Sequence, residues 1–248
     1  MTIDQAFNAN TASYDDWMQR ALLGFTDLFD TAVHVIPFPA DQPIRVLDLG
    51  AGTGLFSQHI LAAYPHAEFV LVDVADKMLD VARKRFSSQK DQFRFEISDY
   101  RSLQGSREYD LVISSLSIHH LTDDEKRRLF QSIYGILQTT GVFINVDQIR
   151  GETETLRQLY WNRWMKHVRH SGATREQIQA SIKRRTEFDK DANLADQIAW
   201  LREAGFSSFD CVYKNYFLGV FLAIKGNLTD LIAKNAQYSS ISKQEGSI

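Results

Sequence analysis

A glycine-rich turn that directly follows a buried strand is the feature that most constrains how this chain folds. The strand runs from Val46 to Leu49 and is apolar apart from Asp48. The next five residues are Gly-Ala-Gly-Thr-Gly, and a helical pattern begins at Leu55. Open α/β sheets bind ligands at such strand-to-helix turns, where glycines supply positive φ angles and let a ligand lie against the backbone. We therefore predict a ligand site at three glycines: Gly50, Gly52 and Gly54.

Strand and helix patterns alternate along the chain and predict an α/β fold. The expected strands are IRVLDLG, EFVLVD, QFRFEI, YDLVISS and GVFINVD, with helical stretches between most of them. Such alternation implies crossover connections and a mostly parallel sheet. Only Lys214 and Asn215 separate the last two strands, SSFDCVY and YFLGVFLAI, and so short a link forces an antiparallel hairpin. The predicted fold is Rossmann-like: a mostly parallel seven-stranded sheet with a C-terminal antiparallel hairpin and a helical lid.

Two helical segments interrupt the alternation and are expected to form the lid. One runs from about Thr11 to Val35 and is rich in aromatic residues, and the other, Gly151 to Lys190, has no strand pattern. A further helix ends at Gly205, as helices commonly do at glycine. The expected segments are an N-terminal helical lid (1–40), an α/β core (41–150), a helical cap (151–190), a C-terminal helix and hairpin that complete the core (191–236) and a flexible tail (237–248).

Charge and cysteine content limit the class of protein. The 248 residues carry a formal net charge of −3, which gives no broad basic field for nucleic acid. The short basic run Lys183-Arg184-Arg185 favours a solvated helix face over a phosphate-binding patch. A single cysteine, Cys211, excludes an intrachain disulfide and suits a reducing compartment. Because the chain shows no secretory leader and no membrane-spanning run, we expect a cytoplasmic protein.

The glycine spacing and the acid beside it indicate the kind of ligand. Dinucleotide-binding turns have the spacing G-x-G-x-x-G, whereas here the third glycine comes one residue earlier. Asp48 precedes the first glycine by two positions, where it would repel a diphosphate but attract an ammonium group. The pattern therefore favours a nucleoside that bears a positive group and disfavours an NAD-dependent oxidoreductase.

Acidic residues also lie at the ends of the next two strands. Asp73 ends the second strand, at the position that hydrogen-bonds ribose hydroxyls in folds of this kind. Asp99 follows the third strand and is a candidate acceptor for an adenine amino group, with Tyr100 beside it for ring contact or packing. Each acid alone is more often a solvated loop residue, but three at neighbouring strand ends form a coherent set.

These motifs resemble those of the class I S-adenosylmethionine (SAM) dependent methyltransferases. The resemblance covers VLDLGAGTG, LVDVADKML, ISDY, YDLVISSLSIHHL and the terminal hairpin. It implies SAM as methyl donor, S-adenosylhomocysteine (SAH) as product, and contacts from the successive strand ends to the methionyl part, the ribose and the adenine. The implied cofactor residues are Tyr14, Arg20, Asp48, Gly50, Ala51, Gly52, Gly54, Asp73, Val74, Asp99, Tyr100 and Ser115. Ser115 would lie near the sulfonium, and Tyr14 and Arg20 would either close over the methionine end or pack the lid.

Within that family the chain is most similar to the carboxy-SAM synthase branch, which serves transfer-RNA wobble modification. The similarity lies in MQRALLGF and in LREAGFSSFDCVYKNYFLGVFLAIKG. Two positions differ, because the branch's cofactor-contacting tyrosine falls on Phe25 and its carboxylate-binding arginine falls on Trp200. Tryptophan cannot make the charged pairing that a carboxylate needs. The sequence therefore predicts a relative that uses ordinary SAM.

Candidate catalytic residues follow the fourth and fifth strands: His119, His120 and Asp147. The adjacent histidines allow three interpretations, namely packing or helix capping, an acceptor-facing base, and metal binding. No cysteine, glutamate or further histidine stands at metal-ligand spacing, so no metal is predicted. Asp147 either serves catalysis or bonds the neighbouring loop. Methyl transfer needs alignment and exclusion of water, and a base only where the acceptor carries a proton of high pKa.

Aromatic residues in the helical cap form the candidate acceptor site. Tyr160, Trp161 and Trp164 lie in TLRQLYWNRWMKHVRHSG, whose apolar residues exceed what one buried face needs. They either pack on the N-terminal helix or form a pocket for a flat or apolar molecule. The predicted activity is in-line methyl transfer to a small molecule, by a protein for which a homodimer is reasonable. The alternatives are a carboxy-SAM-synthase-like or RNA-modifying enzyme, and a SAM-binding protein without catalysis.

Overall fold

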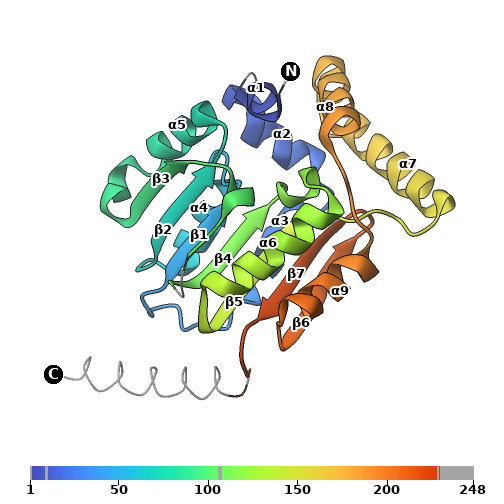
Figure 1. The fold of residues 1–248 in the computed structure, drawn as a ribbon. Helices are drawn as coiled ribbons and strands as arrows, with labels where there is room; N and C mark the ends of the chain where they lie inside the picture. The colour runs from blue at the N-terminus through green and yellow to red at the C-terminus, as the bar shows by residue number, and fades with distance from the viewer. Residues whose placement is uncertain (1, 9–10, 106–107, 228, 230–248) are drawn as a thin grey trace.

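A single seven-stranded sheet forms the centre of the protein (Figure 1). The computed structural model describes residues 2–8, 11–105, 108–227 and 229. The strands are β1 (Arg45–Leu49), β2 (Glu68–Asp73), β3 (Phe93–Ile97), β4 (Tyr109–Ser115), β5 (Leu137–Gln148), β6 (Ser208–Asn215) and β7 (Leu218–Ile224). They lie in the order β3-β2-β1-β4-β5-β7-β6.

The pairing of the strands confirms the predicted fold. The first five strands pair in parallel, and β6 and β7 form the predicted antiparallel hairpin. Because β7 also pairs antiparallel with β5, the edge strand β6 runs in the same direction as the first five. The middle strands β1 and β4 are almost fully buried. Burial on both faces explains why their sequences are nearly continuous apolar runs.

Helices cover both faces of the sheet. The helices are α1 (Ile3–Asn8), α2 (Tyr14–Ala21), α3 (Phe25–His34), α4 (Leu55–Ala63), α5 (Asp76–Arg85), α6 (Asp123–Ile136), α7 (Glu154–His170), α8 (Arg175–Phe188) and α9 (Leu194–Ala204). One apolar cluster joins α3, α4 and α5 to the sheet, and a second joins α6 and α9 to the opposite face. Thr122 caps α6, since its side chain accepts the Glu125 N–H, and Gly205 ends α9 with a φ of 105°.

The remaining helices form a smaller lid than the sequence indicated. In Figure 1, α1, α2 and α8 lie together beyond one end of the sheet, with α7 leading into α8. By contrast, α3 is part of the core, because Leu28, Phe29 and Ala32 are buried against α4 and the sheet. The expected tail, 237–248, lies outside the described residues. None of the described helices combines the length and apolar character needed to cross a membrane.

Candidate active site

The glycine turn after β1 has the predicted backbone conformation. Gly50, Gly52 and Gly54 have φ angles of 68°, 55° and 73°, a region that strongly favours glycine. A Cβ atom on Gly50 would lie 1.9 Å from the Ser117 hydroxyl oxygen. A Cβ atom on Gly54 would lie 2.6 Å from the Phe86 ring instead, so this third glycine lets α4 pack against α5 rather than lining the cavity.

A cavity of about 540 Å³ lies over this turn. That volume is within the usual range for small-molecule sites, roughly 300–1,000 Å³. The predicted cofactor residues in its wall are Tyr14, Gly50, Gly52, Asp73, Val74, Asp99 and Tyr100. Ala51 and Ser115 line a small adjoining cavity together with Tyr14. The site expected from the strand ends is thus assembled in one place, and we call the larger space the donor cavity.

Two predicted acids in the donor cavity already have partners in the chain. Asp73 accepts the backbone N–H groups of Gly52 and Ala75, each at 2.8 Å, and so ties the glycine turn to the end of β2. Asp99 accepts hydrogen bonds from the backbone N–H and side chain of Arg101, and these bonds lower the pKa of its carboxyl. Arg101 lines the same cavity, and nothing in the sequence pattern distinguished it.

Asp48 lies beneath the turn rather than in the cavity wall. Its side chain is buried, with 1% of the residue exposed. One oxygen accepts the Ser57 hydroxyl at 2.6 Å, and the other has no hydrogen-bond partner among the described residues. Burial raises the pKa of Asp48 to about 7, a rise that the Ser57 bond opposes and the charge of Asp73 reinforces. A carboxylate in this state gains a great deal from a nearby cation.

The N-terminal lid docks directly onto the glycine turn. Asp15 on α2 accepts the Thr53 hydroxyl at 2.6 Å and an ion pair from Arg85 of α5. Tyr14 is thereby held over the donor cavity. Arg20, expected beside it, points elsewhere: it pairs with Asp16 at 2.9 Å and donates to the Gly172 carbonyl at 2.7 Å. The lid residues that contact the turn were therefore missed by the sequence reasoning.

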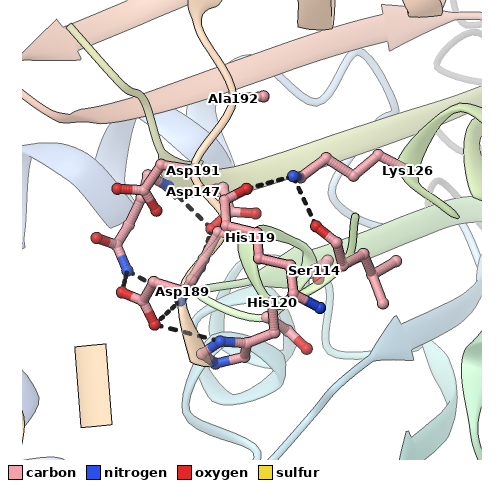
Figure 2. A network of polar contacts seen from close by, with 12 residues as sticks. Ser114, His119, His120, Lys126, Asp147, Asp189, Asp191 and Ala192 are labelled. Atoms are coloured by element: carbon pink, nitrogen blue, oxygen red, sulfur yellow. Dashed lines mark hydrogen bonds and ion pairs between the residues drawn. The ribbon is translucent and has the colours of Figure 1, made fainter. Parts of the chain in front are cut away.

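His119 belongs to a buried polar network (Figure 2). Its Nδ1 lies 2.5 Å from an Asp147 oxygen, and its Nε2 lies 2.9 Å from the Gln148 amide nitrogen and 3.5 Å from Asp189. Burial alone would lower the pKa of His119, but the charges of Asp147 and Asp189 outweigh it and raise the pKa to about 10. His119 therefore links Asp147 to Asp189 and to the Gln148 side chain, with both ring nitrogens occupied.

His120 has a different environment from its neighbour. It lines the donor cavity and also a small cavity beside it. Its Nδ1 lies 3.3 Å from Asp189, yet neither ring nitrogen has a hydrogen-bond partner among the described residues. Burial, followed by the charge of His119, lowers the pKa of His120 to about 4. The imidazole that lines the donor cavity is thus the neutral one.

The same histidines and Asp189 offer three ligand-type atoms within 4.8 Å of one another. Asp189 follows α8, so the spacing of the histidines gave no sign of this third group. Asp189 lies 3.5 Å from His119 and 4.0 Å from Arg185, and the neutral His120 ring lies beside it at 3.3 Å. Ion pairs within the chain therefore account for the cluster, and the expectation that no metal binds stays a prediction.

Two further cavities extend from the donor cavity toward the helical cap. The central cavity, about 70 Å³, shares Phe7, Tyr14, Leu116 and His120 with the donor cavity. The outer cavity, about 260 Å³, shares Trp164, Arg185 and Phe217 with the central one. Shared walls mean that the three spaces follow one another from the glycine turn to α7.

The aromatic residues of the cap divide between the two interpretations offered for them. Tyr160 and Trp161 are partly buried and line the outer cavity. Trp164 also lines it, but its ring is buried and its N–H donates to the Ala21 carbonyl at 3.1 Å. Trp164 therefore joins α7 to α2 as lid packing, while Tyr160 and Trp161 remain available to a ligand.

The prediction of a solvated basic face on α8 is wrong for two of its three residues. Lys183 is solvated, with 69% of its side chain exposed. Arg184 and Arg185 are partly buried and line the central cavity, because this face of α8 covers it. Trp200, by contrast, is buried among the residues of α6 and α9, where Arg127 lies 5.8 Å from its ring centre. The position that would hold the carboxylate-binding arginine is therefore in the core.

Comparisons with known proteins agree with this geometry. A family model described as a methyltransferase domain matches residues 46–141. Carboxy-S-adenosyl-L-methionine synthase of Helicobacter hepaticus is 23% identical over 229 residues, covering 88% of this chain and 94% of that protein. Malonyl-acyl-carrier-protein O-methyltransferase 1 of Ilyobacter polytropus is 26% identical over 139 residues, covering 56% of this chain and 49% of that protein. The chain thus spans about half the length of the latter.

The fold also occurs in solved structures. Human N-acetylserotonin methyltransferase in complex with SAM superimposes with a TM-score of 0.58 and 18% sequence identity, covering 92% of this chain and 61% of that one. At an identity this low, the superposition shows a shared fold and nothing further. It leaves the acceptor of each protein to be argued from its own side chains.

Proposed function

We propose that the chain is a class I SAM-dependent methyltransferase, as its similarity to a methyltransferase domain and to carboxy-SAM synthase supports, and that it transfers a methyl group from SAM to a small-molecule acceptor. The observation that carries the proposal is the succession of three cavities from the glycine turn to the cap. A donor in the first cavity and an acceptor in the other two would meet at the residues that the donor and central cavities share. The acceptor cavities are lined by side chains and measure about 70 and 260 Å³, a size that suits a small molecule better than a polymer.

The residues of the donor cavity would hold SAM by its polar edges. Gly50 and Gly52 leave room for the ligand against the backbone, and Asp73 and Asp99 offer carboxylates at the ends of neighbouring strands. The unpartnered oxygen of Asp48 lies behind the turn and suits the positive methionyl end. SAM supplies a methyl carbon already activated by a positively charged sulfur.

The transfer itself would need little acid–base chemistry. A lone pair of the acceptor forms a bond to the methyl carbon while the carbon–sulfur bond breaks, and that electron pair remains on sulfur in SAH. Tyr14 and Leu116 lie where the donor and central cavities meet and would exclude water there. A proton released by the acceptor would pass to His120 or to water. Because the pKa of His120 is lowered to about 4, this imidazole is a weak base and suits an acceptor that is already nucleophilic.

Asp147 and His119 would act on the reaction only through their neighbour. The two side chains contact each other, and although His119 lines the central cavity, both of its ring nitrogens already have partners in the chain. Their contribution is to fix the loop after β4 and to hold Asp189 beside the His120 ring. We therefore assign His120 to the reacting region and assign His119 and Asp147 to positioning.

A carboxy-SAM-synthase-like activity is the second candidate, favoured by the coverage of 94% of that relative. The buried Trp200 argues against it, because the position offers no cation to a carboxylated sulfonium. A SAM-binding protein without catalysis is the remaining alternative. The cytoplasmic location and the homodimer expected from the sequence stay predictions, which fractionation and light scattering would test.

Two measurements test the proposed function. Calorimetric titration should detect binding of SAM and SAH but not of NAD. Incubation with methyl-labelled SAM and separate low-molecular-weight, protein and RNA fractions should then label the low-molecular-weight fraction. Label in RNA alone, or SAM binding with no label in any fraction, would replace the proposal with one of the alternatives.

A further inference from the structure

One guanidinium in the candidate acceptor site has no anionic partner in the part of the chain that the structure describes. Arg184 on α8 is partly buried and lines the central cavity. Its neighbours on the helix are both paired, since Lys183 lies 3.9 Å from Glu187 and Arg185 lies 2.7 Å from Asp191. Among the described residues, no carboxylate oxygen comes within 4.0 Å of Arg184. Partial burial of an unpaired charge is unfavourable, so a missing partner is worth seeking.

Arg184 is close to the place where the donor and central cavities meet. Its guanidinium carbon lies 5.4 Å from the centre of the Phe7 ring. That ring in turn contacts Tyr14 at 6.1 Å and His120 at 5.6 Å between ring centres. Burial raises the pKa of Tyr14 to about 12, and the positive charge of Arg184 is the largest influence that opposes the rise. One aromatic ring therefore separates the unpaired cation from the residues that face the methyl group.

The acid already present in the central cavity does not neutralise Arg184. Asp189 lies 3.5 Å from His119 and 3.3 Å from His120, and it accepts the Gln148 amide at 2.9 Å. Its charge is thus satisfied by side chains other than Arg184. Moreover, the outer cavity adds Arg150, which is exposed and has no carboxylate oxygen within 4.0 Å among the described residues. The acceptor side of the site therefore contains two arginines, Arg150 and Arg184, that no described carboxylate neutralises.

We propose, on the basis of the proposed function, that the acceptor is an aromatic or apolar carboxylic acid whose carboxylate pairs with Arg184. A guanidinium binds a carboxylate through two parallel hydrogen bonds, and a flat carboxylate suits a central cavity of about 70 Å³. The apolar part of the acid would lie along Trp164 and Phe217, which the central and outer cavities share, and would reach toward Trp161. Arg184 is then a specificity residue for the acceptor.

Pairs of an acid and its neutral amide provide the test. The probes are phenylacetate with phenylacetamide and indole-3-acetate with indole-3-acetamide, titrated calorimetrically into wild type, Arg184→Met and the matched control Lys183→Met, each saturated with SAH. Charge-assisted hydrogen bonds contribute about 1.5–3 kcal/mol, which corresponds to a factor of about 10–100 in affinity. We expect the acids to bind wild type at least about tenfold more tightly than the amides. Arg184→Met should remove that preference, whereas Lys183→Met should keep it.

Other outcomes would overturn the proposal. Equal binding of acids and amides, no binding of either acid, or an equal loss in Lys183→Met would show that Arg184 does not select a carboxylate. A loss of SAH affinity in Arg184→Met with unchanged acid binding would assign the cation to the carboxylate of the donor. Arg184→Gln gives a second variant if the methionine variant misfolds. Failure of wild type to bind SAH would instead count against the proposed function, and acid titrations without SAH keep the two failures distinguishable.

Discussion

The donor cavity and the two acceptor cavities are built in different ways. The donor cavity is formed largely by loops that follow β1 to β4, and its shape depends on backbone conformation at Gly50 and Gly52. The acceptor cavities are formed by side chains of α2, α7, α8 and the residue before β7, which are far apart in the sequence. A backbone-defined site suits a ligand common to a whole family, whereas a side-chain-defined site can change from one member to the next.

The two regions also differ in charge, because acidic residues predominate at the donor cavity and arginines predominate at the acceptor cavities. Asp73 and Asp99 line the donor cavity and Asp48 is buried beneath its glycine turn, whereas Arg150, Arg184 and Arg185 line the acceptor side. SAM carries a positive sulfur, and the proposed acceptor carries a carboxylate. The two regions would therefore attract opposite charges and bring them together at the residues that the cavities share.

The largest expected effect comes from removing the buried His119 side chain, which lies between Asp147 and Asp189. His119→Ala would leave Asp147 and Asp189 buried without their cation, and breaking such a pair costs about 3–5 kcal/mol. For a chain of this length the melting temperature should fall on the order of 10 °C, whereas the exposed His66→Ala should change little. Calorimetric melting measures both variants, and an equal effect in both would contradict the assigned network.

The stability conferred by His119 should also depend on pH in a defined direction. The folded-state pKa, about 10, is raised above the unfolded value of about 6.5. The stabilisation is therefore fully present below about pH 6.5 and is lost as the pH rises through about 10. The difference in melting temperature between wild type and His119→Ala should shrink over this interval.

The next largest effect should come from the glycine turn. Gly50→Ala forces a side chain into a φ of 68° and against the Ser117 side chain, a strain of about 1–3 kcal/mol. SAM affinity should fall by at least about tenfold. Gly135→Ala, on α6 with nothing within 4 Å of the added atom, is the matched control and should be neutral or stabilising by about 0.5–1 kcal/mol. Retained SAM affinity in Gly50→Ala would remove the turn from the donor site.

A pH-dependent effect of similar or smaller size is expected at Asp48. Its folded-state pKa, about 7, exceeds the unfolded value of about 3.9, so the native state binds more protons between these values. The stability of the ligand-free protein should therefore fall as pH rises from about 4 to 7, and Asp48→Asn should lose part of this dependence. The same variant should bind SAM more weakly at pH 8, whereas the exposed Asp80→Asn should match wild type. Identical melting profiles for Asp48→Asn and wild type would contradict the raised pKa.

The smallest effect, about 1–2 kcal/mol in acceptor binding, is expected at Trp161. Trp161→Ala should weaken acceptor affinity and leave SAM affinity and stability near wild type, because the ring is only partly buried. Leu159→Ala, with 52% of the residue exposed on the same helix, is its control. Trp164→Ala is a poorer test, because loss of its buried ring should cost about 3–5 kcal/mol in stability. Unchanged acceptor affinity in Trp161→Ala would end the pocket assignment.

The same contrast explains how much the sequence could predict. The sheet, the glycine turn and the acids at the strand ends follow from local patterns, because a strand, its turn and the next helix are neighbours in the chain. Asp15 and Asp189 were missed because each acts through a partner that only the tertiary fold brings near. Arg101 pairs with Asp99 two residues away, but its pair with Glu125 depends on the tertiary fold. A helix presents different residues to different neighbours, so the pattern around Arg184 could not show which face of α8 covers the cavity.

The structure places α3 in the core and shows Arg20 in lid packing, the second of the two interpretations offered for it. The segment around Phe29 resembles a lid helix by its position before the first strand, but its apolar side chains are buried in the core. Arg20 follows Tyr14 on α2 by six residues and therefore points away from it, toward Gly172. The spacing of these two residues on one short helix is sufficient to predict this geometry.

A crystal structure of the protein with SAH tests the central claim most directly. The account predicts the adenosyl group along the carboxyl ends of β1 to β3 and the sulfur facing the central cavity between Tyr14 and His120. SAH bound with its sulfur turned away from that cavity, or a donor cavity that stays empty at a saturating concentration of SAH, would contradict it.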